Sequence, residues 1–262
     1  MTWHRFVAIG DSFTEGLDDR ADNGRHHGWA DRVAATMAVD NPDIQYANLA
    51  IRGRRLDNIV TDQLPRAIAM EPDLISIGGG INDALRPRWD VNRSRDTLES
   101  GVAAARSAGI DVLLFSFGDP SRRSRALGLV SSRLSEYRDV VHAVASENDC
   151  YLVDFWDETL FDDRRFWADD RLHANELGHE RVAAMVATTL GLGQFEWDQP
   201  LPPAPPTSGL DAVVSDARWT GQHLLPWFAR HLRGRSSGDG IHAKRPRFET
   251  IEPDLALQRS ST

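Results

Sequence analysis

Residues 6–16 constrain the fold more than any other stretch of the chain. Residues 6–9 are apolar and predict a buried strand, which Gly10, Asp11 and Ser12 end. In an open α/β sheet, ligands bind at the carboxyl ends of the strands, where this pattern places the Ser12 hydroxyl. Glycine, aspartate and serine are also ordinary turn residues, so this stretch alone does not distinguish a site from a turn.

Strands and helices alternate along the rest of residues 28–190. This order predicts an α/β fold in three layers, with a doubly wound, mostly parallel five-stranded sheet covered on both faces. Gly109 is placed to end one helix and Asn175 to cap another. Besides residues 6–10, the expected strands are 44–50, 72–77, 110–117 and 151–155, and the expected helices are 28–39, 56–68, 95–108, 124–147 and 177–190.

The net charge, the single cysteine and the lack of long apolar runs limit the kinds of protein that this chain can be. The chain has 262 residues and a formal net charge of -9, which argues against a nucleic-acid partner because polyanions bind to positive surfaces. Its single cysteine, Cys150, cannot close an intramolecular disulfide. No signal peptide is evident, and no run approaches the roughly 18 apolar residues of a membrane span. We therefore expect a cytoplasmic protein.

The composition changes after Trp197. We expect residues 1–197 to form the main domain, residues 198–209 a proline-rich linker, and residues 210–262 a helical, basic extension with a disordered end. Apolar spacing predicts an amphipathic helix over residues 210–233. We expect this helix to pack on its own domain, with weak association with a membrane surface or a partner as the alternative.

Four loops carry residues suited to acyl transfer. Ser12 follows the first strand, Gly53 the second, Asn82 the third, and residues 170–173 the fifth. Loops after successive strands converge at one edge of a doubly wound sheet. Acyl transfer by serine needs a nucleophile, a base, a group that orients the base, and donors for an oxyanion, and these loops could supply all of them.

Asp170 and His173 are the candidates for the base and its orienting group. Asp170 lies three residues before His173, close enough for its carboxylate to hold the far ring nitrogen and select the tautomer. Asp169 could be proposed for the same role, but it lies one residue further from His173 than this spacing requires. Either carboxylate could also be a solvated charge in the acidic run 162–170.

The four blocks together resemble the SGNH, or GDSL-type, hydrolase superfamily of esterases and lipases over residues 3–192. The matching blocks are Gly-Asp-Ser-Phe at 10–13, with Phe13 in place of the usual leucine, Gly53, Gly-Ile-Asn-Asp at 80–83, and Asp-Arg-Leu-His at 170–173. Thr14 stands where a Gly-x-Ser-x-Gly elbow would have its last glycine, which argues against the α/β-hydrolase fold.

The resemblance implies a role for each matching residue. Ser12 would be the nucleophile, His173 the base and Asp170 its orienting group. The backbone N–H groups of Ser12 and Gly53 and the Asn82 amide would form the oxyanion hole. The implied protein is a serine hydrolase that cleaves small-molecule esters through an acyl-serine intermediate, with no metal or organic cofactor. Asp11 and Asp83 are interpreted as stabilising the turns.

Other functions remain open on the sequence. The same machinery serves a carbohydrate O-deacetylase, a thioesterase or an acyltransferase. A metal-dependent phosphoesterase using Asp169, Asp170, His173 and His179, or a non-catalytic binding module, is less favoured. Loops at 18–27, 86–89 and 120–123 are expected to line the acyl pocket. Their arginines suggest a polar or acidic substrate, and surface arginines with solvated partners explain them equally well. The sequence does not indicate the oligomeric state.

Overall fold

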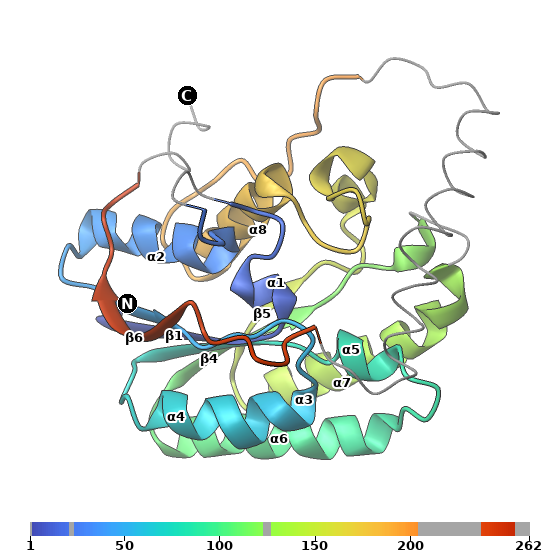
Figure 1. The fold of residues 1–262 in the computed structure, drawn as a ribbon, viewed down its shortest axis with the longest axis horizontal. Coiled ribbons are helices and arrows are strands. Elements are labelled where there is room, and N and C mark those ends of the chain that lie inside the picture. The colour runs from blue at the N-terminus through green and yellow to red at the C-terminus, as the bar shows by residue number, and fades with distance from the viewer. Residues whose placement is uncertain (1, 21–23, 123–126, 204–236, 255–262) are drawn as a thin grey trace.

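The computed structural model describes residues 2–20, 24–122, 127–203 and 237–254, and its centre is one open sheet of six strands (Figure 1). The strand order is β5-β4-β3-β1-β2-β6, and every neighbouring pair is parallel except β2 and β6. The strands are β1 Arg5–Gly10, β2 Gln45–Asn48, β3 Leu74–Gly78, β4 Asp111–Ser116, β5 Tyr151–Asp154 and β6 Arg245–Thr250.

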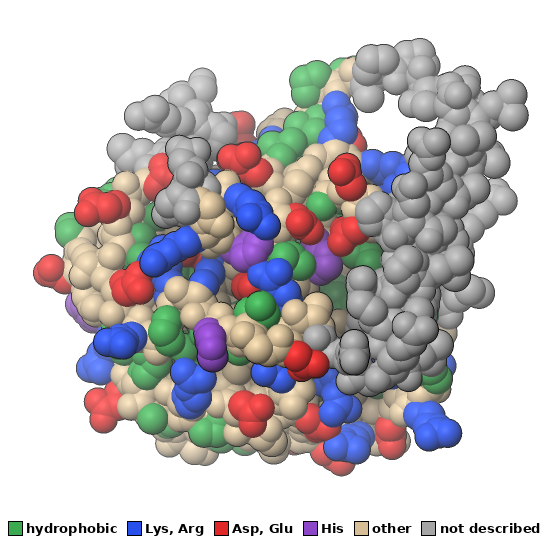
Figure 2. Space-filling view, in the orientation of Figure 1, with side chains coloured by type: hydrophobic (Ala, Val, Ile, Leu, Met, Phe, Trp, Pro, Cys, Tyr) green, Lys and Arg blue, Asp and Glu red, His purple; other side chains and the backbone are tan. Residues whose placement is uncertain are grey.

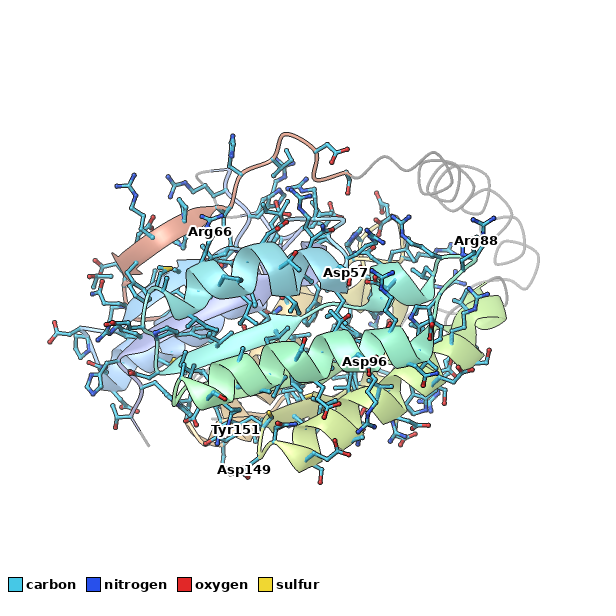
Figure 3. All side chains as sticks on the ribbon, turned by 90° about the horizontal axis from the view of Figure 1, so that it is seen from below. Asp57, Arg66, Arg88, Asp96, Asp149 and Tyr151 are labelled. Atoms are coloured by element: carbon cyan, nitrogen blue, oxygen red, sulfur yellow. The ribbon has the colours of Figure 1, made fainter. Side chains whose placement is uncertain are left out.

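Helices cover both faces of the sheet, as expected. Figure 1 shows α1, α2 and α8 on one face and α3 to α7 on the other, and Figure 3 shows the second layer from below. The apolar core is accordingly divided in two, one part on each face of the sheet. The α-helices are α1 Ser12–Glu15, α2 Gly28–Asp40, α3 Leu56–Asn58, α4 Leu64–Ile68, α5 Ile81–Ala84, α6 Val91–Ser107, α7 Ser131–Glu147 and α8 Glu176–Thr189. A π-helical turn, Ile59–Gln63, joins α3 to α4, and 3-10 turns span Pro120–Arg122, Leu127–Val130, Thr159–Asp162 and Arg164–Phe166.

The expected helix ends are confirmed at two positions. Gly109 has a left-handed φ of 76° just after Ala108, the residue that caps the end of α6, and the Asn175 side chain accepts a hydrogen bond from Gly178 N at 3.0 Å. Two helix starts differ from the prediction. Helix α6 begins four residues early because Asp90 caps it, and α7 begins at Ser131 after a 3-10 turn.

The sixth strand corrects the expectation of five strands. Strand β6 runs antiparallel to β2, with Gln45 opposite Thr250 and Tyr46 opposite Glu249. Pro246 lacks an N–H donor, which an edge strand tolerates. Figure 2 shows basic and acidic side chains interspersed on this face of the molecule. Lys244 and Arg245 pair with Asp31 of α2, and Arg245 also pairs with Glu249. The helix expected over 210–233 lies outside the described residues, and the division at 197 and 209 stays a prediction.

The strand order places the candidate site. The chain winds from β1 outward to β2 and then crosses to β3 on the other side of β1. Loops diverge at such a switch point and leave a crevice above the carboxyl ends of the two strands. Ser12 follows β1 and Asn82 follows β3, so the two residues lie at this crevice. None of the helices in the described part of the chain is long and apolar enough to cross a membrane.

Candidate active site

Ser12 is held by a tightly packed strand end. A Cβ atom at Gly10 would lie 2.2 Å from the Gly78 carbonyl oxygen, so only glycine permits this approach of β1 to β3. The buried Gln63 amide accepts a hydrogen bond from Gly10 N at 2.8 Å and donates one to Gly10 O at 2.9 Å. Asp11 caps α1 by accepting from Phe13 N. The Ser12 hydroxyl therefore sits on a short, well-anchored helix at the switch point.

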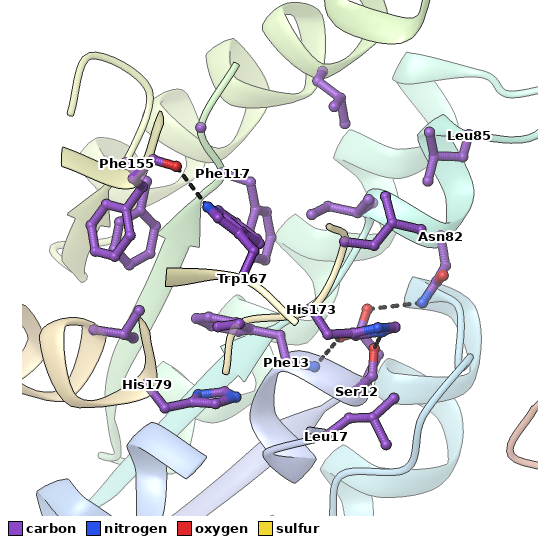
Figure 4. A pocket seen from close by; sticks show the side chains of 18 of the residues that line it. Ser12, Phe13, Leu17, Asn82, Leu85, Phe117, Phe155, Trp167, His173 and His179 are labelled. Carbon is purple, nitrogen blue, oxygen red and sulfur yellow. Dashed lines mark hydrogen bonds between the residues drawn. The ribbon is translucent and has the colours of Figure 1, made fainter. Parts of the chain in front are cut away.

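His173 lies between Ser12 and Asp170 and contacts both. His173 Nε2 lies 3.0 Å from Ser12 Oγ, and His173 Nδ1 lies 2.6 Å from Asp170 Oδ2 (Figure 4). The other Asp170 oxygen accepts from the backbone N–H groups of Leu172 and His173, at 2.9 and 3.0 Å. Three acceptor contacts hold the carboxylate, which in turn orients the imidazole. A continuous hydrogen-bonded path thus runs from Asp170 to Ser12.

Electrostatics at His173 favour its charged form. Burial disfavours the imidazolium, but the hydrogen bond to Asp170 and the charges of Asp170 and Asp18 outweigh it and raise the pKa of His173. Burial also opposes ionisation of Asp170, but the contacts with His173 lower the pKa of Asp170 to about 2. Asp18 Oδ2 lies 3.7 Å from His173 Nδ1. The sequence reasoning did not single out Asp18, which stands in a polar loop with no distinguishing pattern.

The loop that carries Gly53 is fastened at several points. Gly53 has a left-handed φ of 70°, which favours glycine. Arg52 N donates to Glu15 Oε2 at 2.7 Å, on the helix of Ser12. On the far side of the loop, Asp83 Oδ2 accepts from Leu56 N at 2.9 Å. The loop at 51–55 is therefore tied both to α1 and to α5.

Asn82 faces the same loop and also contacts Asp11. Its Nδ2 donates to Asp11 Oδ2 at 2.9 Å and to Arg54 O at 3.1 Å. Asp11 is 4% exposed, and burial raises its pKa from 3.8 to about 7, against the opposing effect of its hydrogen bonds. Burial likewise raises the pKa of Asp83 to about 6. The two carboxyls therefore stabilise the turns, as expected, and Asp11 also holds the amide of Asn82.

An apolar pocket of about 150 Å³ opens beside Ser12. Figure 4 shows Phe13, Phe117, Phe155 and Trp167 on one side of His173, and Asn82 and Leu85 on the other. The deeper wall comes from α7 and α8 and from the 3-10 turns around them. Further lining residues are Leu17, Ile81, Val130, Leu134, Phe161, Leu172, Ala174, His179 and Val182.

The pocket corrects the expectation of arginine-lined walls. Of the three loops expected there, the described residues supply no arginine to the lining; the neighbouring Leu17, Leu85 and Gly118 line it instead. Arg88 is exposed and points away from the fold (Figure 3). Arg122 forms ion pairs with Asp157 and Asp162. The arginines therefore carry no indication of an acidic substrate.

The residues proposed for a metal site do not come together as a group of four. Asp169 is exposed, whereas His179 is buried and accepts from Trp29 N through Nδ1. Burial lowers the pKa of His179 to about 4, which keeps the ring neutral. Within the described residues, the acidic and histidine side chains spaced closely enough to hold a metal ion are Asp18, Asp170 and His173. Two of these belong to the hydrogen-bonded path to Ser12.

The model of the GDSL-like lipase/acylhydrolase family matches residues 8–181, a range that includes all four blocks. No curated protein matches the chain.

Several solved structures share the fold. An acetylxylan esterase from Geobacillus stearothermophilus, Axe2, is 22% identical with a TM-score of 0.59, and the match covers 75% of this chain and 96% of that one. The protein TesA is 25% identical with a TM-score of 0.60, covering 72% and 99%. LAE5, an α/β hydrolase enzyme from the metagenome of Lake Arreo in Spain, is 22% identical with a TM-score of 0.60, covering 72% and 95%.

Proposed function

Because this chain belongs to the GDSL-like lipase/acylhydrolase family, within the SGNH hydrolase superfamily, we propose that it is a serine esterase acting through an acyl-serine intermediate. The observation that carries this proposal is the hydrogen-bonded path from Asp170 through His173 to Ser12. A base within hydrogen-bond reach of a hydroxyl, itself oriented by a carboxylate, is the arrangement that activates serine.

The reaction would proceed in two halves. Ser12 Oγ attacks the ester carbonyl while His173 Nε2 takes its proton, and Asp170 stabilises the resulting imidazolium. His173 then gives the proton to the leaving alkoxide, and the acyl group remains on Ser12. Water, deprotonated by His173, releases the acid and restores the serine. The proposed reaction requires only these residues and water.

The oxyanion would be held between three loops. The donors are the backbone N–H groups of Ser12 and Gly53 and the side-chain amide of Asn82. Because Asn82 Nδ2 donates to Asp11 and Arg54 in the unliganded protein, an oxyanion would take the place of one of these acceptors. Arg54 O is the one that the substrate would replace, because the buried Asp11 carboxyl is fixed to α1.

The pocket supports an apolar acyl group of medium length. A dry cavity of similar volume in another protein admits benzene, so about 150 Å³ would hold roughly six carbon atoms. An acetyl group would leave most of this space empty. The solved acetylxylan esterase shares the fold, so a carbohydrate O-deacetylase remains the second candidate. Thioesterase and acyltransferase activities would use the same residues.

A panel of substrates tests the proposal. Nitrophenyl acetate, butyrate, hexanoate and laurate, acyl-CoA, and acetylated xylo-oligosaccharide would be assayed in parallel, with Ser12→Ala as the blank. We expect hexanoate or butyrate esters to react fastest, and a fluorophosphonate to label Ser12. A dominant rate on acyl-CoA or on the acetylated sugar would replace the esterase by the corresponding alternative.

Two further outcomes concern the less favoured functions. Full activity after exhaustive chelation is expected, and its loss would support a metal-dependent phosphoesterase through Asp18, Asp170 and His173. Hydrolysis by Ser12→Ala at the wild-type rate would contradict the nucleophile, and the absence of hydrolysis by the wild type would favour a binding module. A cytoplasmic location stays a prediction.

A further inference from the structure

The C-terminal segment 237–254 returns to the sheet beside the candidate site. Its strand, β6, pairs with the outer edge of β2, and Asn48 stands opposite Arg245. The family match ends at residue 181, and the solved structures named above cover about three quarters of this chain. β6 is therefore an addition to the part of the chain that the family model matches. Figure 1 shows the segment passing close to α3 and the loop before it.

Lys244, the residue just before β6, has a side chain that is mostly buried. Its side chain is 10% exposed and its ammonium group donates to the Asp31 carboxylate and to the carbonyl oxygens of His26 and His27. Burying an ammonium group is costly unless it is paired and fully hydrogen-bonded, as it is here. Arg245 Nε donates to the other Asp31 oxygen at 2.9 Å. Lys244 and Arg245 thus both pair with the buried carboxylate of Asp31, and these ion pairs hold β6 against α2.

One chain of hydrogen bonds connects this ion pair to the helix of Ser12. Tyr46 OH donates to Asp31 Oδ2 at 3.3 Å. Asn48 Nδ2 in turn donates to Tyr46 OH at 2.9 Å and to Thr14 O at 2.8 Å. Thr14 lies in α1, two residues after the nucleophile. All the side chains of this path are buried.

A second set of contacts reaches the loop of Gly53 directly. A Cβ atom at Gly238 would lie 2.2 Å from the Arg52 carbonyl oxygen, so the segment packs against the loop without room for a side chain. Arg52 Nη2 lies 2.6 Å from His26 Nε2, next to the carbonyl oxygens that Lys244 contacts. Arg52 also contacts Glu15 of α1 through both its backbone and its guanidinium. At Gly238 the segment therefore packs directly against this loop, which Arg52 also ties to His26 and to Glu15 of α1.

From these contacts we propose that residues 238–250 clamp the loop of Gly53 against the helix of Ser12, and that Lys244 is a positioning residue for the oxyanion hole. The proposal rests on the proposed esterase function. Oxyanion donors act in the transition state, so their misplacement lowers kcat and leaves the binding of the acyl chain in the apolar pocket unchanged. If the segment served only to stabilise the fold, substitutions in it would lower the melting temperature and leave kcat unchanged.

Four full-length variants test the clamp. Lys244→Met removes the ammonium and leaves Arg245 on Asp31, while Lys244→Arg keeps the charge. Gly238→Ala drives a methyl group into the Arg52 carbonyl without any change of charge. The matched control is Arg247→Met, because Arg247 is an exposed cation of the same strand. Active sites are titrated with a fluorophosphonate, and kcat and KM for hexanoate ester hydrolysis are measured well below each melting temperature.

The expected pattern separates positioning from stability. Lys244→Met and Gly238→Ala should lower kcat per titrated site by roughly 10-fold to 100-fold, less than the loss of a whole oxyanion donor, with KM within about twofold. Lys244→Arg should recover most of kcat, and Arg247→Met should match the wild type. Wild-type kcat in both Lys244→Met and Gly238→Ala, with only the melting temperature lowered, would overturn the clamp. If Lys244→Met does not fold, the kcat of Gly238→Ala decides the test. A wild type that hydrolyses no ester would overturn the esterase proposal and the clamp with it.

Discussion

The acyl pocket sets a chain-length preference whose size can be worked out. Each buried methylene contributes about 0.8 kcal/mol, or roughly fourfold in kcat/KM. A pocket of about 150 Å³ holds roughly six carbons, so a hexanoyl group would bury about four methylenes more than an acetyl group. We therefore expect kcat/KM for hexanoate to exceed that for acetate by about 3 kcal/mol, roughly 200-fold, and to stop rising with longer chains.

Substitution of Val182 would change the volume of the acyl pocket. This residue lies in α8, is 3% exposed and lines the pocket. Val182→Phe adds about four carbon atoms to the wall and should leave room for little more than an acetyl group. The hexanoate advantage should then fall from roughly 200-fold to about unity, while kcat/KM for acetate stays within about threefold. Val182→Ala, the matched variant, should move the optimum to a longer chain.

Hydrolysis rates for a series of nitrophenyl esters from acetate to decanoate provide the assay. Melting temperatures accompany the rates, since overpacking costs about 1–3 kcal/mol of folding free energy. A wild-type profile that falls from acetate to hexanoate would refute the assignment of this cavity to the acyl chain. An unchanged hexanoate-to-acetate ratio in Val182→Phe would refute it equally.

Four further predictions concern the polar side of the site. The kcat/KM of the wild type should rise with pH to a midpoint above 6.5, because His173 must be neutral to act as a base and its pKa is raised. Asp170→Asn should lower kcat by about 10⁴ and move that midpoint to lower pH, and an unmoved midpoint would show that Asp170 does not set the pKa of His173. Asn82→Ala should lower kcat by roughly 10² to 10³, and a change below about threefold would remove Asn82 from the oxyanion hole. Asp11 has a folded-state pKa raised from 3.8 to about 7, so the stability it contributes is fully present below 3.8 and is lost as pH rises through about 7. Urea unfolding between pH 4 and pH 8 should therefore show a steeper decline for the wild type than for Asp11→Asn, and parallel declines would contradict the raised pKa.

Local patterns were sufficient to predict the sheet and the polar blocks. The first strand could be recognised in the sequence because a strand that is covered on both faces consists of consecutive apolar residues, and here Gly10 and Ser12 mark its end. Asp170 and His173 lie three residues apart, so their contact depends on one loop alone. The Asn175 cap is local for the same reason.

Two features could not be predicted because they depend on distant segments. The sequence of β6 is rich in charge and contains Pro246, so it does not resemble a strand. It forms because the edge of β2 offers free backbone groups and because Asp31 requires a cation. The arginine-rich loops were misinterpreted because only the folded chain decides which side of a loop faces the pocket.

The sequence by itself determined the alternation of strands and helices and the identity of the polar residues at the strand ends, since both follow from periodicity and from contacts within a few residues. Only the tertiary structure decided that Ser12 and His173, 161 residues apart, lie within hydrogen-bond distance. It also decided that the pocket is apolar and that the Lys244 side chain is buried against Asp31 of α2. Burial and desolvation belong to the packed molecule, because they depend on which segments exclude water from one another.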